Sequence, residues 1–297
     1  MKALFQTLRF IYSHPLTRDQ RLSATKRFFK WQVGARLLPY EILHPFVGNT
    51  KLLVKRGMAG ATGNIYVGLH EFAEMAFLLH LLRPEDLFGD IGANIGSFTI
   101  LASGVVGASS VTAEPVPSTY SYLKRNVILN DLESLVQVLN IGVGAEPGEL
   151  RFTSGHDTVN HVVTGATGND EATVLVRIRT MDELFADRTP VLLKIDVEGF
   201  EMAVLKGGSR TFSQPGLQAL IMEINGACRR YGVAEEDIHR QVLSHGFHPV
   251  TYSPFERKLG PAASFDPNGN TIYVRDEAWV ANRVASAAGV KIFNKTI

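Results

Sequence analysis

The segment Leu87–Val106 joins an apolar run to a helical pattern through the glycine turn G-D-I-G-A-N-I-G-S, residues 89–97. A strand, a tight turn and a helix start form the ligand-holding corner of a doubly wound α/β sheet. Apolar runs and helical patterns continue to alternate beyond it, which predicts a mostly parallel sheet covered by helices. The expected strands are 87–91, 110–113, 135–139, 191–195 and 219–224. The expected helices are 97–106, 117–129, 200–205 and 235–244.

The chain departs from this alternation on both sides. Residues 1 to about 48 predict a helical extension, and apolar spacing predicts a helix over residues 70–82. Short strands are expected between them, at 51–54 and 64–67. We therefore expect a basic N-terminal extension over residues 1–68 and an α/β domain over residues 69–297.

Two later regions also break the pattern. Strands are expected at 150–153 and 173–178, and the polar stretch between them, residues 154–171, has no periodicity. Long insertions of this kind are commonly functional loops. Two closing strands, near 247–252 and 271–274, have no helical pattern between them. They imply an antiparallel pair at the sheet edge.

Charge is unevenly distributed, although the net charge of the 297 residues is only +1. Residues 1–60 hold eleven Lys or Arg against two acids, Asp19 and Glu41, which gives +9 and leaves −8 for the remainder. Such a segment can meet an anionic membrane surface, a nucleic acid or an acidic substrate, or form a solvated face on an acidic domain. The last interpretation is the simplest. We expect no nucleic-acid partner and at most a weak membrane-surface contact through residues 1–60.

The cysteine count and the hydropathy pattern indicate which cellular compartment to expect. Cys228 is the only cysteine, which excludes a disulfide within the chain and a cysteine-based metal cluster. No cleavable leader is apparent, and no run approaches the ~20 apolar residues of a membrane span. A cytoplasmic protein is the expectation.

The glycine turn differs from a dinucleotide-binding fingerprint in two ways. Gly92 and Gly96 are four residues apart, so the G-x-G-x-x-G pattern is missing. Asp90 also precedes the turn; its carboxylate would repel a phosphate but suits an ammonium or sulfonium group. The turn therefore predicts S-adenosyl-L-methionine rather than NAD. Gly92 would allow close approach of the ligand, Gly96 would allow tight helix packing, and Asn94 would support the turn or bind the ligand.

Two acidic motifs follow other strands of the same expected sheet. Glu114-Pro115 ends the second strand, where a carboxylate can hold a pair of ribose hydroxyls. Asp196 and Glu198, from K-I-D-V-E-G-F-E, lie where a later strand meets its loop, so they should border the same pocket. Carboxylates there could act as a general base, hold a divalent cation or stabilise the start of a helix.

Together these motifs resemble the FkbM family of S-adenosylmethionine-dependent methyltransferases. The resemblance rests on D-I-G-A-N-I-G, the E-P pair, N-x-x-L-N at residues 126–130, and K-I-D-V-E-G-F-E followed by V-L-K-G. It spans about residues 66–226 and includes Glu71, which matches an acid on the helix before the first motif. The family implies a Rossmann-like, seven-strand class I methyltransferase sheet with a reversed edge strand.

The resemblance also implies roles for the motif residues. Asp90, Gly92 and Asn94 would contact the methionine part of the cofactor, Glu114 the ribose, and the loop near Asn140 the adenine. Asp196 and Glu198 would flank the reactive methyl group. The expected cofactor-binding residues are thus Glu71, Asp90, Gly92, Asn94, Gly96, Glu114, Pro115 and Asn140.

The expected activity is methyl transfer to a hydroxyl of a sugar or small metabolite, with Asp196, Glu198 and His161 as catalytic candidates and no assigned metal. An ordinary role as a polar loop histidine explains His161 and His156 equally well. Three alternatives stay open: a Mg²⁺-dependent O-methyltransferase with Asp196 and Glu198 as ligands, a non-catalytic S-adenosylmethionine-binding module, and a NAD-linked reductase. The missing dinucleotide fingerprint disfavours the last of these.

Overall fold

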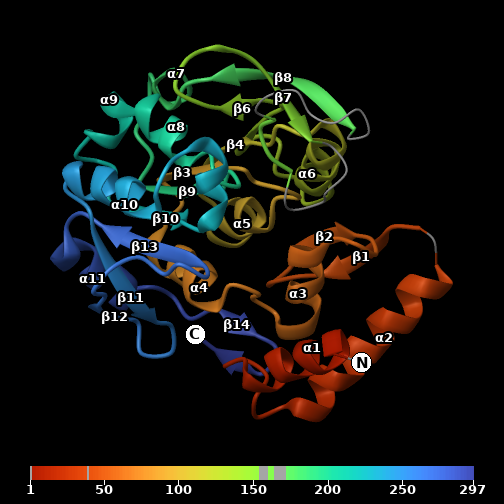
Figure 1. The fold of residues 1–297 in the computed structure, drawn as a ribbon. Coiled ribbons are helices and arrows are strands. Elements are labelled where there is room, and N and C mark those ends of the chain that lie inside the picture. Colours follow the sequence, from red (N-terminus) through yellow and green to blue (C-terminus); the bar gives the residue numbers. More distant parts are fainter. Residues whose placement is uncertain (1, 39, 154–159, 164–171) are drawn as a thin grey trace.

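A computed structural model describes residues 2–38, 40–153, 160–163 and 172–297, and an eight-stranded sheet forms its centre (Figure 1). From one edge to the other, the strands are β12 (Lys258–Pro261), β11 (His248–Ser253), β13 (Asn270–Val274), β10 (Ala219–Glu223), β9 (Leu192–Ile195), β3 (Leu87–Ile91), β4 (Ser109–Ala113) and β5 (Val136–Leu139). This arrangement confirms the expected fold class.

Strand direction follows the expectation closely. The strands β10, β9, β3, β4 and β5 are parallel to one another. The reversed strand β13 lies between β10 and β11 and is antiparallel to both, so the closing pair is confirmed. Strand β12 adds an eighth member at the edge, antiparallel to β11. This strand was not predicted, because it belongs to a short, polar hairpin.

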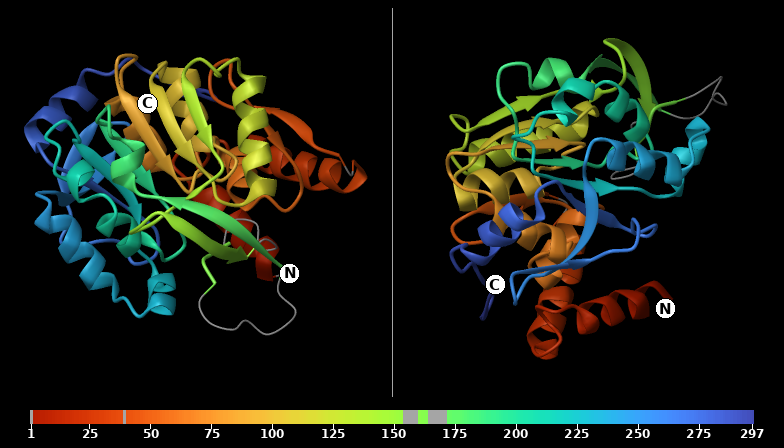
Figure 2. Two further views of the ribbon diagram at one scale, coloured as in Figure 1. Left: turned by 90° about the horizontal axis from the view of Figure 1, so that it is seen from above. Right: turned by 90° about the vertical axis from the view of Figure 1, so that its left-hand side faces the viewer.

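Helices cover both faces of the sheet (Figure 2). On one face pack α4 (Phe72–Leu81), the turn-bearing helix formed by α5 (Ser97–Thr99) and η1 (Ile100–Val106), and α11 (Glu277–Ala285). On the other face pack α7 (Met181–Leu184), α8 (Glu201–Lys206), α9 (Ser209–Phe212) and α10 (Glu235–Ser244). Helix α6 (Pro117–Leu129) begins at Pro117, which needs no hydrogen-bond partner at that position. The helix expected at 97–106 thus forms, and η1 is its wider, π-helical part.

The N-terminal residues form α1 (Lys2–Ser13), α2 (Arg21–Leu37), β1 (Ile42–Pro45), β2 (Lys51–Val54) and α3 (Ala59–Val67). The strand expected at 64–67 is wrong, because these residues end helix α3. Tyr66 packs edge-to-face on Phe28 of α2, with ring centroids 5.1 Å apart. Packing against α2 therefore overrides the strand preference of Ile65, Tyr66 and Val67. The domain boundary at residue 68 stays a prediction.

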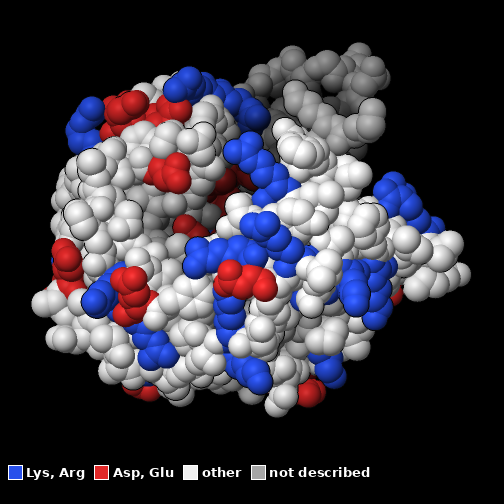
Figure 3. Space-filling model, turned by 90° about the horizontal axis from the view of Figure 1, so that it is seen from below, with Lys and Arg blue, Asp and Glu red and all other residues white. Residues whose placement is uncertain are grey.

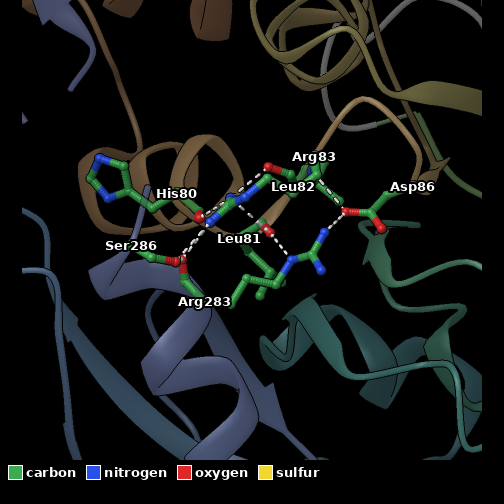
Figure 4. A network of polar contacts seen from close by, with 7 residues as sticks. All are labelled: His80, Leu81, Leu82, Arg83, Asp86, Arg283 and Ser286. Carbon is green, nitrogen blue, oxygen red and sulfur yellow. Dashed lines mark hydrogen bonds and ion pairs between the residues drawn. The ribbon is translucent and has the colours of Figure 1, made fainter. Parts of the chain in front are cut away.

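A polar network fixes the chain just before β3 (Figure 4). The Arg83 guanidinium donates to the carbonyl oxygens of His80 and Leu82, each at 2.8 Å, and to that of Arg283 at 2.6 Å. Arg283 in turn forms an ion pair with Asp86. These contacts satisfy carbonyl groups at the end of α4 that lack partners within the helix. They tie α11 to the entrance of β3 and so support the glycine turn that follows.

A second, three-stranded sheet consists of β6 (Gly142–Val143), β8 (Thr173–Arg179) and β7 (Gly148–Thr153), in that order. It confirms the two strands expected around the polar insertion, whereas β6 forms within the loop that was expected near Asn140. Most of the insertion, including His156, lies outside the described residues. The remaining elements are η3 (Gly226–Tyr231) and the hairpin β14 (Lys291–Ile292) and β15 (Lys295–Thr296).

Candidate functional site

A cavity of about 380 Å³ lies at the carboxyl ends of β3, β4, β9 and β10. Its titratable lining residues are His70, Glu71, Asp90, Glu114, Lys194, Asp196, Glu198 and Glu223. In Figure 3, acidic side chains are visible in a hollow on the face seen from below. Six carboxyl groups against one lysine make the cavity suited to a ligand that carries positive charge.

Most residues that the sequence singled out meet in this cavity. Glu71, Asp90, Gly92, Asn94, Glu114, Pro115, Asp196 and Glu198 all line it. Gly96, Asn140 and His161 are not among its lining residues. Gly96 packs against Leu123, since a Cβ there would lie 2.6 Å from Leu123 Cδ1. Asn140 donates from Nδ2 to the carbonyl oxygens of Glu114 and Pro115, both at 2.9 Å, and the backbone N–H of His161 donates to Thr153.

The glycine turn brings two loops into contact. Gly92 has φ +81°, and a Cβ at this position would lie 1.8 Å from the carbonyl oxygen of Asp196. Only glycine fits this conformation without displacing the backbone of the facing loop. Asn94 also has a positive φ, 52°, and its side-chain oxygen accepts from Ile95 N–H at 2.7 Å. Asn94 therefore supports the turn, one of the two roles expected for it.

Asp90 and Glu114 both use their carboxylates to hold the backbone. Asp90 Oδ2 accepts from the N–H (3.1 Å) and the hydroxyl (2.6 Å) of Thr99, but its buried Oδ1 has no partner among the described residues. Glu114 accepts from the N–H groups of Asn94 and Val116, both at 3.0 Å. Burial raises the pKa of Asp90 to about 6 and that of Glu114 to about 7. A buried acceptor without a partner fits an ammonium donor.

The Glu114→Gln variant is expected to bind S-adenosylmethionine at least about tenfold more weakly, because an amide cannot accept hydrogen bonds at both terminal atoms. Binding to the unchanged protein should also weaken as pH falls through about 7, the pKa of Glu114. Affinity should fall in that direction because the ribose hydroxyls would donate to the ionised carboxylate, and protonation removes its negative charge. Calorimetric titrations above and below this pH measure both effects.

The variant should lose the part of this pH dependence that lies near 7. Glu149→Gln, at an exposed position of β7, is the matched control and should bind like the unchanged protein. Equal affinity of Glu114→Gln and the control would refute the assignment of Glu114 to the ribose.

Lys194 and three acids form the charged centre of the cavity. Lys194 is 4% exposed, and its Nζ donates to Asp196 Oδ2 at 2.6 Å and lies 4.8 Å from the centre of the Phe98 ring. Burial opposes the charge of Lys194, but neighbouring carboxylates, Asp196 first, raise its pKa. One oxygen from each of Asp196, Glu198 and Glu223 lies within 4.8 Å of the others. This spacing fits a shared proton or a divalent cation.

Lys194 and Glu223 are site residues that were not predicted, although the sequence carries a signal for each. Lys194 interrupts an apolar strand, and a buried charge there requires a partner. Glu223 ends β10 at the same sheet edge where Asp196 follows β9. Burial and the charge of Asp196 raise the pKa of Glu223 to about 8 and that of Glu198 to about 7. Both shifts favour the protonated form of these carboxyl groups.

The loop after β9 is held in a tight conformation. Glu198 has φ 54°, which is strained for a residue with a long side chain. A Cβ on the next residue, Gly199, would lie 2.5 Å from the carbonyl carbon of Ala227. Glu201 Oε1 accepts from the N–H groups of Val197 (3.3 Å) and Gly199 (3.1 Å). Glu201 thus fixes the loop, while Glu198 lines the cavity.

The sheet order, the glycine turn after β3 and the acids at neighbouring strand ends define a Rossmann-like class I methyltransferase fold. The sequence model of the methyltransferase FkbM domain matches residues 90–249. The chain therefore belongs to the FkbM methyltransferase family, whose cofactor is S-adenosylmethionine.

Individual relatives share limited sequence identity with this chain, over only part of its length or of theirs. Methyltransferase sdnD of Sordaria araneosa is 31% identical over 171 residues, covering 46% of this chain and 65% of the relative. Hexuronic acid methyltransferase AglP of Haloferax volcanii is 27% identical over 164 residues, covering 54% and 63%. The solved precorrin-6y C5,15-methyltransferase of Geobacter metallireducens aligns with a TM-score of 0.41 and 11% identity, covering 78% of this chain and 98% of that one. The chain spans less than two thirds of the length of the curated relatives that it matches.

Proposed function

We propose that this protein transfers a methyl group from S-adenosylmethionine to a hydroxyl oxygen of a sugar or another small metabolite. The observation that carries the proposal is the carboxylate of Asp196, which lines the cavity beside the glycine turn and is hydrogen-bonded to Lys194. The name of the relative from Haloferax volcanii, a hexuronic acid methyltransferase, supports a sugar as the acceptor.

The first two motifs would hold the cofactor. Asp90 Oδ1, which has no partner among the described residues, would accept from the ammonium group. Gly92 leaves room for close approach, and Glu114 would accept from the ribose hydroxyls. When bound, the cofactor supplies a methyl carbon that the sulfonium sulfur makes electrophilic.

Asp196 would accept the proton of the acceptor hydroxyl. Lys194 fixes its orientation through Oδ2, and Glu223 offers a second carboxyl group nearby that can exchange the proton with solvent. A general base contributes about 10²–10⁴-fold to a rate. Correct positioning of the reacting groups can lower the barrier by about 7–11 kcal/mol. The walls of the cavity are therefore expected to contribute more than the base.

A second candidate function is O-methyl transfer that depends on a divalent cation. The spacing of Asp196, Glu198 and Glu223 favours it, because hard cations such as Mg²⁺ bind carboxylate oxygens. Activity that disappears in EDTA and returns with Mg²⁺ would support this variant. Activity that survives excess EDTA would exclude a role for the cation. The three carboxyl groups would then share a proton instead.

A labelled-methyl transfer screen tests the proposal. Glycosides, lipid-linked sugars and small hydroxylated metabolites are each incubated with the protein and methyl-labelled S-adenosylmethionine. We expect label in one of these classes with the unchanged protein and far less with Asp196→Asn. Cofactor binding without transfer to any hydroxyl acceptor would favour a non-catalytic binding module, and transfer to amines alone would overturn the oxygen acceptor.

A further inference from the structure

Helix α2 buries one side and exposes an apolar stripe on the opposite side. The buried residues are Ala24, Phe28, Trp31 and Ala35. The exposed apolar residues are Leu22 (82%), Phe29 (51%), Val33 (55%) and Leu37 (74%). Residues at these spacings share one face of a helix. We call the four exposed residues the α2 stripe.

Exposed apolar side chains gather in this part of the chain. Of the fourteen large hydrophobic residues that are exposed in the described structure, nine lie between residues 4 and 43. Scattered single residues of this kind are normal on a protein surface, whereas a contiguous set marks an interaction site. Phe29, Val33 and Leu37 form such a set, because they are spaced four residues apart along a helix of 17 residues, and Leu22 lies on the same face two turns earlier.

Positive charge borders the α2 stripe. Lys26, Lys30 and Arg36 are exposed and lie on the same side of the helix. Residues 1–40 as a whole hold eight Lys or Arg and a single acid, Asp19. The N-terminal helices lie in the right-hand half of Figure 3, where Lys and Arg side chains are scattered among uncharged ones and few acidic side chains are visible. The surface is thus both apolar and cationic.

We propose that the α2 stripe and its flanking cations dock the protein on the surface of an anionic lipid bilayer, with α2 lying in the plane of the interface. Helices of this kind insert apolar side chains at the boundary of the acyl chains while Lys and Arg attract anionic headgroups. A second copy of the chain fits less well, because a two-fold interface would bring each set of cations against itself. None of the described helices combines the length and hydropathy needed to cross a bilayer.

The docking surface is connected to the cavity through α3. Gly60, Ala61 and Asn64 of this helix line the cavity, and Tyr66 of the same helix packs on Phe28 of α2. The hollow with acidic side chains lies on the face shown in Figure 3, as does the cationic region. A protein docked in this way would hold its cavity beside the bilayer.

Vesicle co-sedimentation tests the proposal without any acceptor or turnover, so its outcome is independent of the proposed reaction. The full chain is mixed with vesicles of phosphatidylcholine alone or of phosphatidylcholine with phosphatidylglycerol. We expect binding to the anionic vesicles, weakened by salt. The variants Phe29→Ser/Val33→Ser and Lys26→Glu/Lys30→Glu should each lower the partition coefficient by about tenfold or more.

Matched controls are Leu243→Ser, an exposed leucine of α10, and Lys206→Glu, an exposed lysine at the end of α8. Both should bind vesicles like the unchanged protein. Circular dichroism and S-adenosylmethionine affinity check that every variant is folded. The proposal is overturned if anionic vesicles fail to bind the unchanged protein, or if the α2 variants bind as well as the controls. A dimer that Phe29→Ser/Val33→Ser dissociates, without vesicle binding, would assign the stripe to a second copy instead.

Discussion

The Asp196→Asn variant is expected to lower kcat by about 10²–10⁴-fold while changing the affinity for S-adenosylmethionine by less than about threefold. Asparagine keeps the size of the side chain and an oxygen that can accept from Lys194 Nζ, which lies 2.6 Å from Asp196 Oδ2. It cannot take up the proton of a hydroxyl acceptor. The loss should therefore fall on turnover rather than on cofactor binding.

Calorimetry for the cofactor and initial rates with the acceptor found by the screen separate these two effects. Asp187→Asn, at an exposed position after α7, removes a carboxylate outside the cavity and serves as the control. If the cofactor affinity of Asp196→Asn fell as much as its kcat, Asp196 would be a binding residue and not the base.

The Gly92→Ala variant is expected to lose about 2–5 kcal/mol of unfolding free energy, from an alanine forced to positive φ and from overpacking. It should also lose most of its cofactor affinity. The new Cβ would lie 1.8 Å from the carbonyl oxygen of Asp196. Because this oxygen belongs to the backbone, a change of side-chain rotamer cannot relieve the clash. Relief requires the glycine turn and the loop after β9 to separate, which opens the cavity at its centre. Denaturant unfolding and calorimetry measure the two losses.

Gly232→Ala isolates the backbone part of this effect. Gly232 has φ +70°, close to that of Gly92, but a Cβ there would have no atom within 4 Å. The control variant should lose only about 1–2 kcal/mol, the cost of a left-handed alanine, and should bind the cofactor normally. Equal destabilisation of the two variants would mean that the contact with Asp196 carries no weight.

Much of the site could be predicted because it depends on local and topological rules. The turn after β3 is encoded by neighbouring residues. The carboxyl ends of parallel strands meet at one sheet edge, so Asp90, Glu114 and Asp196 had to converge. Glu223 obeys the same rule but was overlooked, since its strand carries no motif.

The other features depend on tertiary packing, which cannot be predicted from local sequence. Helix α3 contains two glycines, Gly60 and Gly63, and ends in the β-prone run 65–67. Contact with α2 decides its conformation. The backbone placement of His161, whose N–H donates to Thr153, is set by the pairing of the insertion with β7. Which oxygen of Asp90 stays unpaired depends on Thr99, nine residues away, and spacing alone does not fix such a contact.

Two separate sheets contribute residues to the wall of the cavity. Most of the acids lie on strands of the main sheet or in the loops directly after them, so the register of these strands fixes where the acids are placed. Phe152 and Asn160, which also line the cavity, come from β7 and the residues that follow it. In the described part of the chain, the small sheet to which β7 belongs pairs with no strand of the main sheet. We therefore expect substitutions in the small sheet to reshape this wall of the cavity without shifting the acids that the main sheet positions.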